Sequence, residues 1–152
     1  MQSYKLPVSA LVVIHTTDLQ VLLLERADHP GYWQSVTGSQ DSGETLLQTA
    51  MREVREETGL DTDDYALSDW QIQNRYEIFE EWSWRYPPGT TYNTEYVFGL
   101  ELPKTIPIAV SSREHLGYVW LPWQEAAEKV FSSSNAQAIR MLASKRKSEN
   151  FR

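Results

Sequence analysis

Three glutamates are placed where they could support metal chemistry. Glu53, Glu56 and Glu57 stand at positions i, i+3 and i+4, and at about 100° of rotation per residue they share one side of a helix. Their mutual repulsion costs about 0.2–0.5 kcal/mol per pair, which a bound cation would offset. Mg²⁺ prefers carboxylate oxygens and shares its shell with phosphates. Taken alone, however, the three glutamates favour a solvated helix face with ion pairs.

A helix must position these carboxylates, and its signals flank them. Thr45 and Gln48 fit a capping box, in which each side chain binds a free backbone N–H group. Gly59 supplies the end of the helix. We predict a helix over residues 46–58 with its carboxylates largely apart from an apolar face. That face is expected to comprise Leu47, Ala50, Met51 and Val54.

The surrounding segment, residues 38–60, resembles the Nudix box. That pattern is Gly, five residues, Glu, seven residues, Arg-Glu, an aliphatic, any residue, Glu-Glu, any residue, Gly and an aliphatic. All nine specified positions match over 23 residues. One common departure is Ser39, where many members have a second glycine. The match reverses the preference for a solvated face and favours a phosphoanhydride hydrolase.

The resemblance implies a fold and a set of roles. The fold is α+β, the Nudix fold, an α/β/α sandwich around a mixed β-sheet. Glu53 and Glu57 are implied Mg²⁺ ligands, with Mn²⁺ as a substitute, and Glu56 is a ligand or a water-activating base. Structural support of the box is implied for four residues, Gly38, Glu44, Arg52 and Gly59.

The rest of the chain is rich in strand signals. Strands are expected at residues 7–14, 21–24, 33–37, 94–100 and 118–121, with one or two more over 70–86. Residues 61–64 and 103–114 are expected to be loops. Two C-terminal helices are predicted, one over residues 122–131 and one capped by residues 132–135, with Ala138, Ile139 and Leu142 buried.

Composition narrows the class of protein. A chain of 152 residues with 41% hydrophobic residues fits a single globular domain, residues 1–152. The formal net charge of −7 argues against binding a nucleic acid polymer, RNA decapping included. No run reaches the roughly 18–20 apolar residues of a membrane span. The absence of cysteine excludes thiol catalysis and fits a reducing, cytoplasmic location.

Segments outside the box resemble the bacterial dihydroneopterin triphosphate pyrophosphohydrolases. The similarity covers roughly residues 4–142, and includes Tyr32–Gly38, Tyr76–Phe79, Asn93–Glu95 and Glu114–Tyr118. It weakens at residues 61–73 and 80–84. It implies hydrolysis of dihydroneopterin triphosphate to dihydroneopterin monophosphate and pyrophosphate, an early step of folate synthesis.

The same resemblance implies residues that bind substrate. Lys5 and Arg26 are implied phosphate contacts, although both are also typical surface cations. Glu114 is implied as a metal ligand or general base, although a glutamate in a loop is normally exposed. The other implied contacts are Thr37 beside the metal helix, Tyr76, Glu77, Ile78 and Phe79 in the pterin wall, Phe79 or Trp33 for stacking, and Ser132. Strand aromatics are usually core residues, and Ser132 reads more readily as a helix cap.

Alternative functions stay open. Pterin and purine rings share their shape and amide edges, so a nucleotide pyrophosphatase acting on dATP or oxidised purine nucleotides is the second reading. A non-catalytic Nudix-like ligand sensor is a remote third, because such modules are expected to lose box carboxylates that this chain keeps. The expected partner is therefore a small pterin or purine triphosphate. Neither an oligomeric state nor a metal count is predicted.

Overall fold

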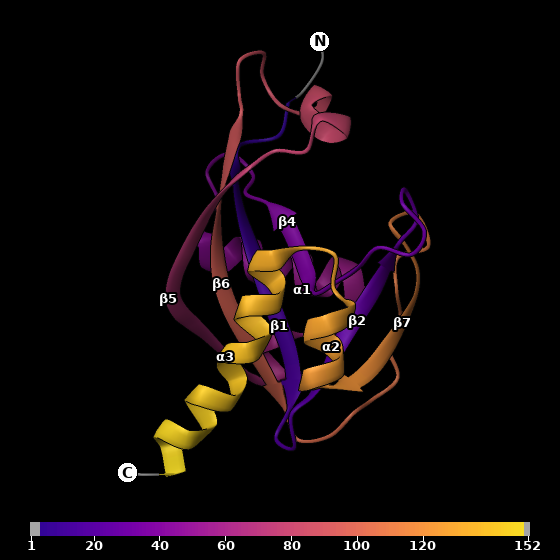
Figure 1. Ribbon diagram of the computed structural model, residues 1–152, viewed down its shortest axis with the longest axis vertical. Helices are drawn as coiled ribbons and strands as arrows, with labels where there is room; N and C mark the ends of the chain where they lie inside the picture. The colour runs from indigo at the N-terminus through magenta and orange to yellow at the C-terminus, as the bar shows by residue number, and fades with distance from the viewer. Residues whose placement is uncertain (1–3, 151–152) are drawn as a thin grey trace.

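The structure is a computed structural model that describes residues 4–150, with side chains described for residues 4–145. Within that range the elements are β1 (Val8–Thr16), β2 (Gln20–Arg26), β3 (Trp33–Gln34), β4 (Val36–Ser39), α1 (Leu46–Thr58), η1 (Thr62–Asp64), β5 (Ala66–Glu77), η2 (Glu80–Arg85), β6 (Tyr92–Leu102), β7 (His115–Pro122), α2 (Trp123–Lys129) and α3 (Ser133–Asn150), where η marks a 3₁₀ helix (Figure 1).

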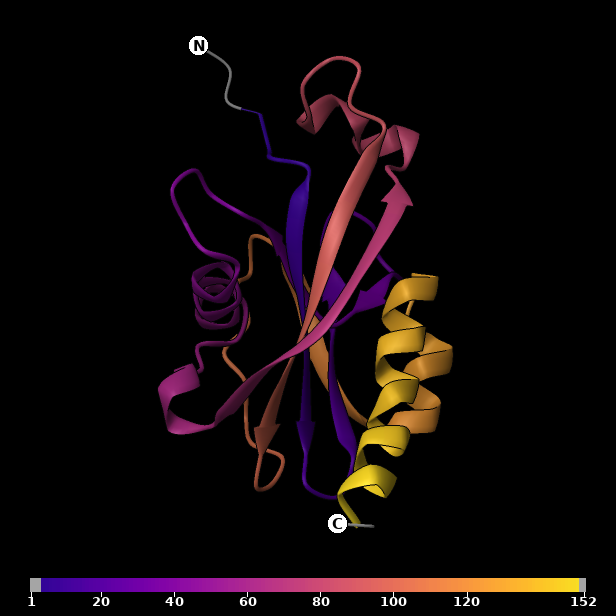
Figure 2. The same ribbon diagram turned by 90° about the vertical axis from the view of Figure 1, so that its left-hand side faces the viewer.

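The described strands form one mixed sheet of seven strands. Its main path runs β3-β2-β1-β6-β5, while β4 pairs with β1 and β7 pairs with β2. The pairing of β1 with β6 is parallel, and the other pairings are antiparallel. Figure 2 shows α1 on one side of this sheet and α2 with α3 on the other. The α/β/α sandwich expected from the resemblance is thus confirmed.

Alternation along β1 divides the core between the two faces of the sheet. Val12 and Ile14 pack on the α1 side together with Val54. Leu11 and Val13 point the other way and pack against α2 and α3, as the twofold period of a strand requires. Ala138, Ile139 and Leu142 are buried there as predicted. Burying a large aliphatic side chain contributes about 1.5–3 kcal/mol to folding. The core clusters on the two faces therefore both stabilise the sheet that carries the site.

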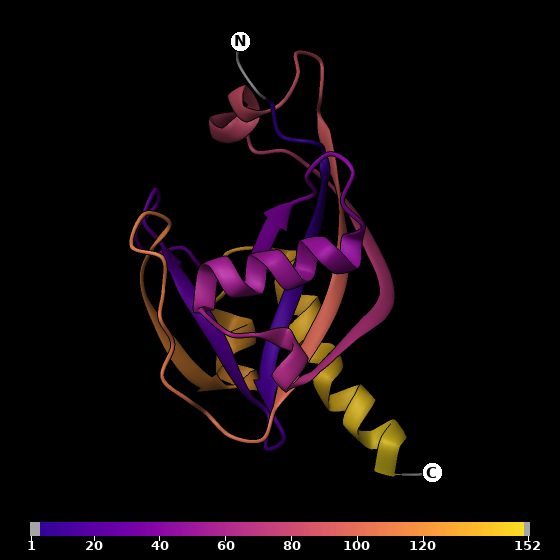
Figure 3. The ribbon, with the colours of Figure 1, turned by 180° about the vertical axis from the view of Figure 1, so that it is seen from behind.

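Helix α1 has the predicted bounds and ends. The Thr45 hydroxyl accepts from the Gln48 backbone N–H at 3.1 Å, and the Gln48 side chain accepts from the Thr45 N–H at 2.8 Å. Gly59 closes the helix in the left-handed region with φ 76°, which glycine adopts without steric cost. Figure 3 shows the helix lying across the sheet.

The predicted apolar face of α1 was wrong in part. Leu47 is 49% exposed, and the buried residues of the helix include Ala50, Glu53, Val54 and Glu57. These four stand at i, i+3, i+4 and i+7, the spacing of one helix face. Two carboxylates therefore lie within the buried face, not beside it. Only Glu56 of the three glutamates stays exposed.

Three other expectations need correction. Residues 80–85 form the 3₁₀ helix η2 instead of continuing a strand. Residues 62–64 form η1 within the expected acidic loop, where Thr62 is buried. β7 starts at His115, earlier than residue 118. In the described part of the chain, no helix has both the length and the apolar character needed to cross a membrane.

Candidate active site

A cavity of about 940 Å³ lies where the sheet meets the start of α3, the η2 segment and one face of α1. The implied metal-binding residues line it, namely Glu53, Glu56, Glu57 and Glu114. So do the implied substrate contacts, namely Lys5, Arg26, Thr37, Tyr76, Glu77, Ile78, Phe79 and Ser132. Residues far apart in sequence thus meet around one space.

Glu57 is a buried carboxylate without a compensating partner. Glu57 is only 1% exposed. Within the described chain, neither of its carboxylate oxygens accepts a hydrogen bond. Burial raises the pKa of Glu57 well above its usual value, and the nearby carboxylates of Glu53 and Glu114 raise it further. A buried charge without a partner is costly, so the site is built for a positive group.

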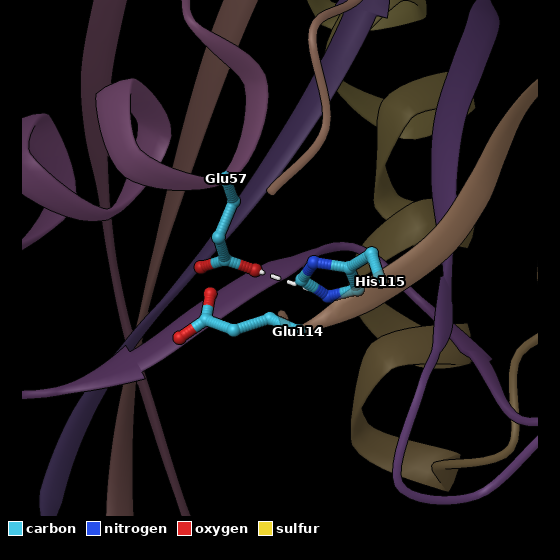
Figure 4. A group of neighbouring side chains, drawn as sticks. All are labelled: Glu57, Glu114 and His115. Atoms are coloured by element: carbon cyan, nitrogen blue, oxygen red, sulfur yellow. Dashed lines mark ion pairs between the residues drawn. The ribbon is translucent and has the colours of Figure 1, made fainter. Parts of the chain in front are cut away.

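Glu114 supplies a second carboxylate from the loop before β7. One ligand atom from each of Glu57, Glu114 and His115 lies within 4.8 Å of the others. Figure 4 shows the two carboxylates close together, with the imidazole beside them. The Nε2 atom of His115 lies 3.4 Å from Glu57 Oε1. Burial lowers the pKa of His115 to about 4, with Arg26 adding to the shift, so the ring is neutral near pH 7 and does not balance the carboxylates.

These donors fit a divalent cation. Carboxylate oxygens are the ligands that hard cations such as Mg²⁺ prefer, and a cation would compensate the orphaned oxygens of Glu57. Glu53 lies next to Glu57, and burial raises the pKa of Glu53 while Arg52 opposes that rise. Sequence spacing gave no reason to assign His115 a role, because Glu57, its partner here, lies on α1, far away in the chain.

Gly38 and Gly59 leave space for neighbouring side chains to approach closely at α1 and its end. A Cβ atom on Gly38 would overlap the carboxyl group of Glu53, so glycine lets the helix approach β4. A Cβ atom on Gly59 would lie 3.3 Å from that of Ala109, in addition to the strain of a positive φ. Both positions therefore restrict the residue type, in line with the support inferred for them.

Arg52 connects the carboxylates around α1. Its guanidinium donates to Glu44 at 2.8 and 3.0 Å, to Glu53 at 2.6 Å and to Glu56 at 3.3 Å. It also donates to the Ser39 carbonyl at 3.0 Å. Glu44 has its pKa lowered to about 2, chiefly by the bond from Arg52. The two residues fix the position of Glu53, whereas Glu56 remains half-exposed and lies outside the Glu57 group.

The cationic side of the cavity is formed by Lys5, Arg26 and Arg85. Arg26 already donates to Asp28 at 2.7 Å through two nitrogens and to Gln34 at 3.0 Å. Lys5 lies in the cavity, where the surrounding protein lowers its pKa, and the neighbouring Arg85 lowers it further. Arg85, which was assigned no role from the sequence, also pairs with Asp28 at 3.2 Å.

Aromatic side chains form another wall of the cavity. Phe79, on the segment after β5, lies 5.4 Å from Trp82 and 6.1 Å from Phe131 between ring centroids. Arg26 stacks over the Trp82 ring at 4.4 Å. The alternative stacking role for Trp33 was wrong, because this residue packs with the α2 and α3 core instead of lining the cavity.

The start of α3 closes the cavity on a further side. The Ser132 hydroxyl accepts from the Asn135 backbone N–H at 3.3 Å and contacts the Ser134 hydroxyl at 3.0 Å. The capping role weighed for Ser132 is therefore present, and the hydroxyl also faces the cavity. Asn135 is buried and donates to Ser35 Oγ at 2.9 Å.

Two buried polar residues on β6 were missed. Asn93 is 1% exposed and Glu95 is 4% exposed, and both line the cavity. The sequence carried only a weak signal, because the alternate positions of this strand read Asn93, Glu95, Val97, Gly99 and Glu101, which is not a clearly apolar face. Their burial, however, depends on β1, β5 and α3, which the spacing alone does not locate.

Comparison with known proteins identifies the class. The NUDIX domain model matches residues 5–142, and the chain belongs to this family of hydrolases, which use divalent metal ions. The chain is 49% identical over 139 residues to the dihydroneopterin triphosphate diphosphatase of Escherichia coli K12, covering 90% of this chain and 91% of that protein. It is 42% identical over 143 residues to the Haemophilus influenzae protein of the same name, covering 92% and 89%.

The fold is also shared with a solved relative. The structure of the E. coli dihydroneopterin triphosphate pyrophosphohydrolase superimposes with a TM-score of 0.87 at 48% identity, covering 92% of this chain and 97% of that one. A more distant relative is the asymmetrical bis(5'-nucleosyl)-tetraphosphatase of Mus musculus, 31% identical over 112 residues, which cover 72% of this chain and 69% of that protein.

Proposed function

We propose that the protein hydrolyses dihydroneopterin triphosphate to dihydroneopterin monophosphate and pyrophosphate, with Mg²⁺ as its metal ion, as a step of folate synthesis. The observation that carries this proposal is the buried, unpaired carboxylate of Glu57 beside Glu114, at the edge of a cavity of about 940 Å³. The name and 49% identity of the E. coli relative support the choice of substrate.

The carboxylates have two tasks in this proposal, metal binding and acceptance of a proton, and Glu114 is a candidate for both. Glu53, Glu57 and Glu114 would hold the metal ion. Bound Mg²⁺ supplies the positive charge that a triphosphate and its leaving group require. Glu56 or Glu114 accepts the proton of the attacking water, since both are exposed to the cavity and therefore reachable by water. Arg52, which also lines the cavity, keeps Glu53 in place through a hydrogen bond of 2.6 Å.

Substrate binding is proposed for the cavity's other walls. Lys5 and Arg26 face the phosphates, and Thr37 lines the floor beside α1. The pterin ring lies against Tyr76, Glu77, Ile78 and Phe79, with Ser132 at the start of α3 on the other side. Such fixed positioning accelerates cleavage of the phosphoanhydride, because the reacting groups are already held in the geometry of the reaction.

A second candidate is a nucleotide pyrophosphatase that acts on dATP or oxidised purine nucleotides. The aromatic group of Phe79, Trp82 and Phe131 favours any flat bicyclic ring. The likeness to a relative named as a nucleosyl tetraphosphatase points the same way. The first candidate keeps preference because its relatives share far more of the sequence.

The test is product analysis after incubation with Mg²⁺ and dihydroneopterin triphosphate. Pyrophosphate and dihydroneopterin monophosphate are expected, and chelation of the metal with EDTA should stop the reaction. Parallel measurements with dATP and 8-oxo-dGTP give the ratio of kcat/KM values that defines specificity. Release of single phosphates, or a higher kcat/KM for dATP, would refute the first candidate.

A further inference from the structure

Two buried acceptor atoms on β6 find no hydrogen-bond donor in the described part of the chain. Asn93 Nδ2 donates to Ser9 Oγ at 2.8 Å and lies 3.1 Å from the Tyr76 hydroxyl. Its Oδ1 atom and the Oε1 atom of Glu95 find no hydrogen-bond partner among the described residues. Leaving such groups buried and unpaired destabilises a fold, so these atoms are placed for a ligand.

Glu95 is the more unusual of the two. Burial raises its pKa, and only the uncharged side chains of Ser134 and Asn74 act against that rise. No cationic group is among these influences, in contrast to Glu53, which is held by Arg52. The residue is more than nine-tenths buried and lines the cavity. A carboxylate in this setting needs hydrogen-bond donors from elsewhere.

Strand register separates this position from the metal-binding carboxylates. Gly38 faces α1, because a Cβ atom there would overlap the Glu53 carboxyl group. Its neighbour Ser39 therefore faces the opposite side of the sheet. Ser39 pairs with Ser9, and Ser9 pairs with Glu95, so these three share that opposite face. Two strand spacings place Glu95 roughly 10 Å from Ser39, which leaves room for an extended substrate between the two regions.

The chemistry of the acceptors selects a type of ring. A 2-amino-4-oxo-pyrimidine ring, present in pterins and in guanine, offers an amino group beside a ring N–H, two donors on one edge. Adenine instead offers an amino donor beside a ring-nitrogen acceptor, which a carboxylate repels. A site with buried hydrogen-bonding groups rejects a ligand that leaves them unpaired.

We propose that the Glu95 carboxylate, assisted by the Asn93 side-chain oxygen, binds the amino and N–H edge of the substrate's 2-amino-4-oxo ring and determines its selection over adenine. This inference rests on the proposed function, because it takes the cavity to hold a ring-bearing triphosphate. It assigns to β6 a specificity role beyond the walls already described.

The first experiment compares wild type with Glu95→Gln, which keeps the shape but replaces an acceptor by a donor. For each, kcat/KM is measured with dihydroneopterin triphosphate, dGTP and dATP. The preference for the pterin and guanine substrates over dATP should fall about tenfold to a hundredfold, the size expected for a charged hydrogen bond. Glu128→Gln, the same change at an exposed residue of α2, should keep the wild-type ratio. An unaltered ratio in Glu95→Gln would overturn the proposal.

Melting temperature separates recognition from support of the fold. Glu95→Gln removes a buried carboxylate without a cation, so its Tm should equal or exceed that of wild type. A lower Tm together with equal losses for all three substrates would assign Glu95 a structural role and overturn the proposal.

Binding of phosphate-free ligands tests the inference apart from catalysis. Neopterin and guanosine should bind the wild-type protein more tightly than adenosine in the absence of metal, measured by pterin fluorescence or calorimetry. Glu95→Gln should reduce that difference. If these ligands show the expected order while no triphosphate is cleaved, the proposed function fails and the ring site stands. If triphosphates are cleaved but neopterin, guanosine and adenosine bind equally, the ring site fails alone.

Discussion

Gly38 and Glu53 are packed so closely that the glutamate carboxyl group occupies the space where any other residue at position 38 would place its Cβ atom. This contact joins β4 to α1 and leaves room for the Glu53 carboxyl group between them. The Nudix-box glycine therefore acts here as a spacer for a carboxylate. Its backbone freedom is secondary, because its φ is not in the positive range that the structure shows for four other glycines.

Gly38→Ala should displace Glu53 and impair the metal site. Overpacking of this kind costs about 1–3 kcal/mol of folding free energy, so the fold should survive. A shift of a catalytic group by about 1 Å can reduce the rate roughly 100-fold, and kcat/KM should fall by that order. Gly117→Ala is the matched control, since a Cβ atom there meets nothing within 4 Å. Equal activity of the two variants would contradict the spacer role.

Local signals explain what the sequence could predict. The start and the end of α1 could be predicted from the sequence, because the capping box and Gly59 act within one or two turns of the helix ends. The burial of Glu53 and Glu57 was not predicted, because charged residues are usually assigned to solvent. Their burial depends on β4 and on Glu114, which approach from distant parts of the chain.

Some features of the site could not be predicted because they depend on strand register and on tertiary contacts. Glu95 lies beside Ser9 only because β6 runs parallel to β1 in one register, and a shift by one residue would turn it to the other face. The resemblance offered Trp33 as an alternative to Phe79 for ring stacking, and the two-residue strand β3 is too short for its period to show that Trp33 packs with the core. The aromatic residues of 80–85 favoured a strand, yet they form a 3₁₀ helix, since tertiary contacts override strand propensity.

Glu57→Gln should nearly abolish turnover while the fold persists. Loss of one metal-binding charge is expected to lower kcat by roughly two to three orders of magnitude. Without metal, the variant should melt no lower than wild type, because it lacks a buried unpaired carboxylate. Added Mg²⁺ should raise the Tm of wild type more than that of the variant, as a ligand that binds only the folded state stabilises it. Full activity in Glu57→Gln would contradict the metal assignment.

Glu114→Ala tests whether the loop carboxylate takes part in the reaction. The residue is exposed, so its removal should change the free energy of unfolding by no more than about 0.5 kcal/mol. Turnover should nevertheless fall by at least ~100-fold, the contribution of a general base. Steady-state kinetics with Mg²⁺ provide the measurement, and Glu125→Ala on α2 is the control at another exposed glutamate. A wild-type rate would show that Glu114 is a solvated surface residue without a role in turnover.

Glu44→Gln should make the stability of the fold depend less on pH in the acidic range. The pKa of Glu44 is lowered to about 2 from a usual value of 4.5, so its ionised form stabilises the fold above about pH 4.5. That stabilisation is lost as the pH falls from about 4.5 to about 2. At pH 7 the variant should melt roughly 2–6 °C below wild type, and the gap should narrow progressively over the acidic range. Thermal denaturation of both proteins from pH 7 to pH 2.5 measures it, and a gap that stays constant with pH would show that the bond from Arg52 does not control this ionisation.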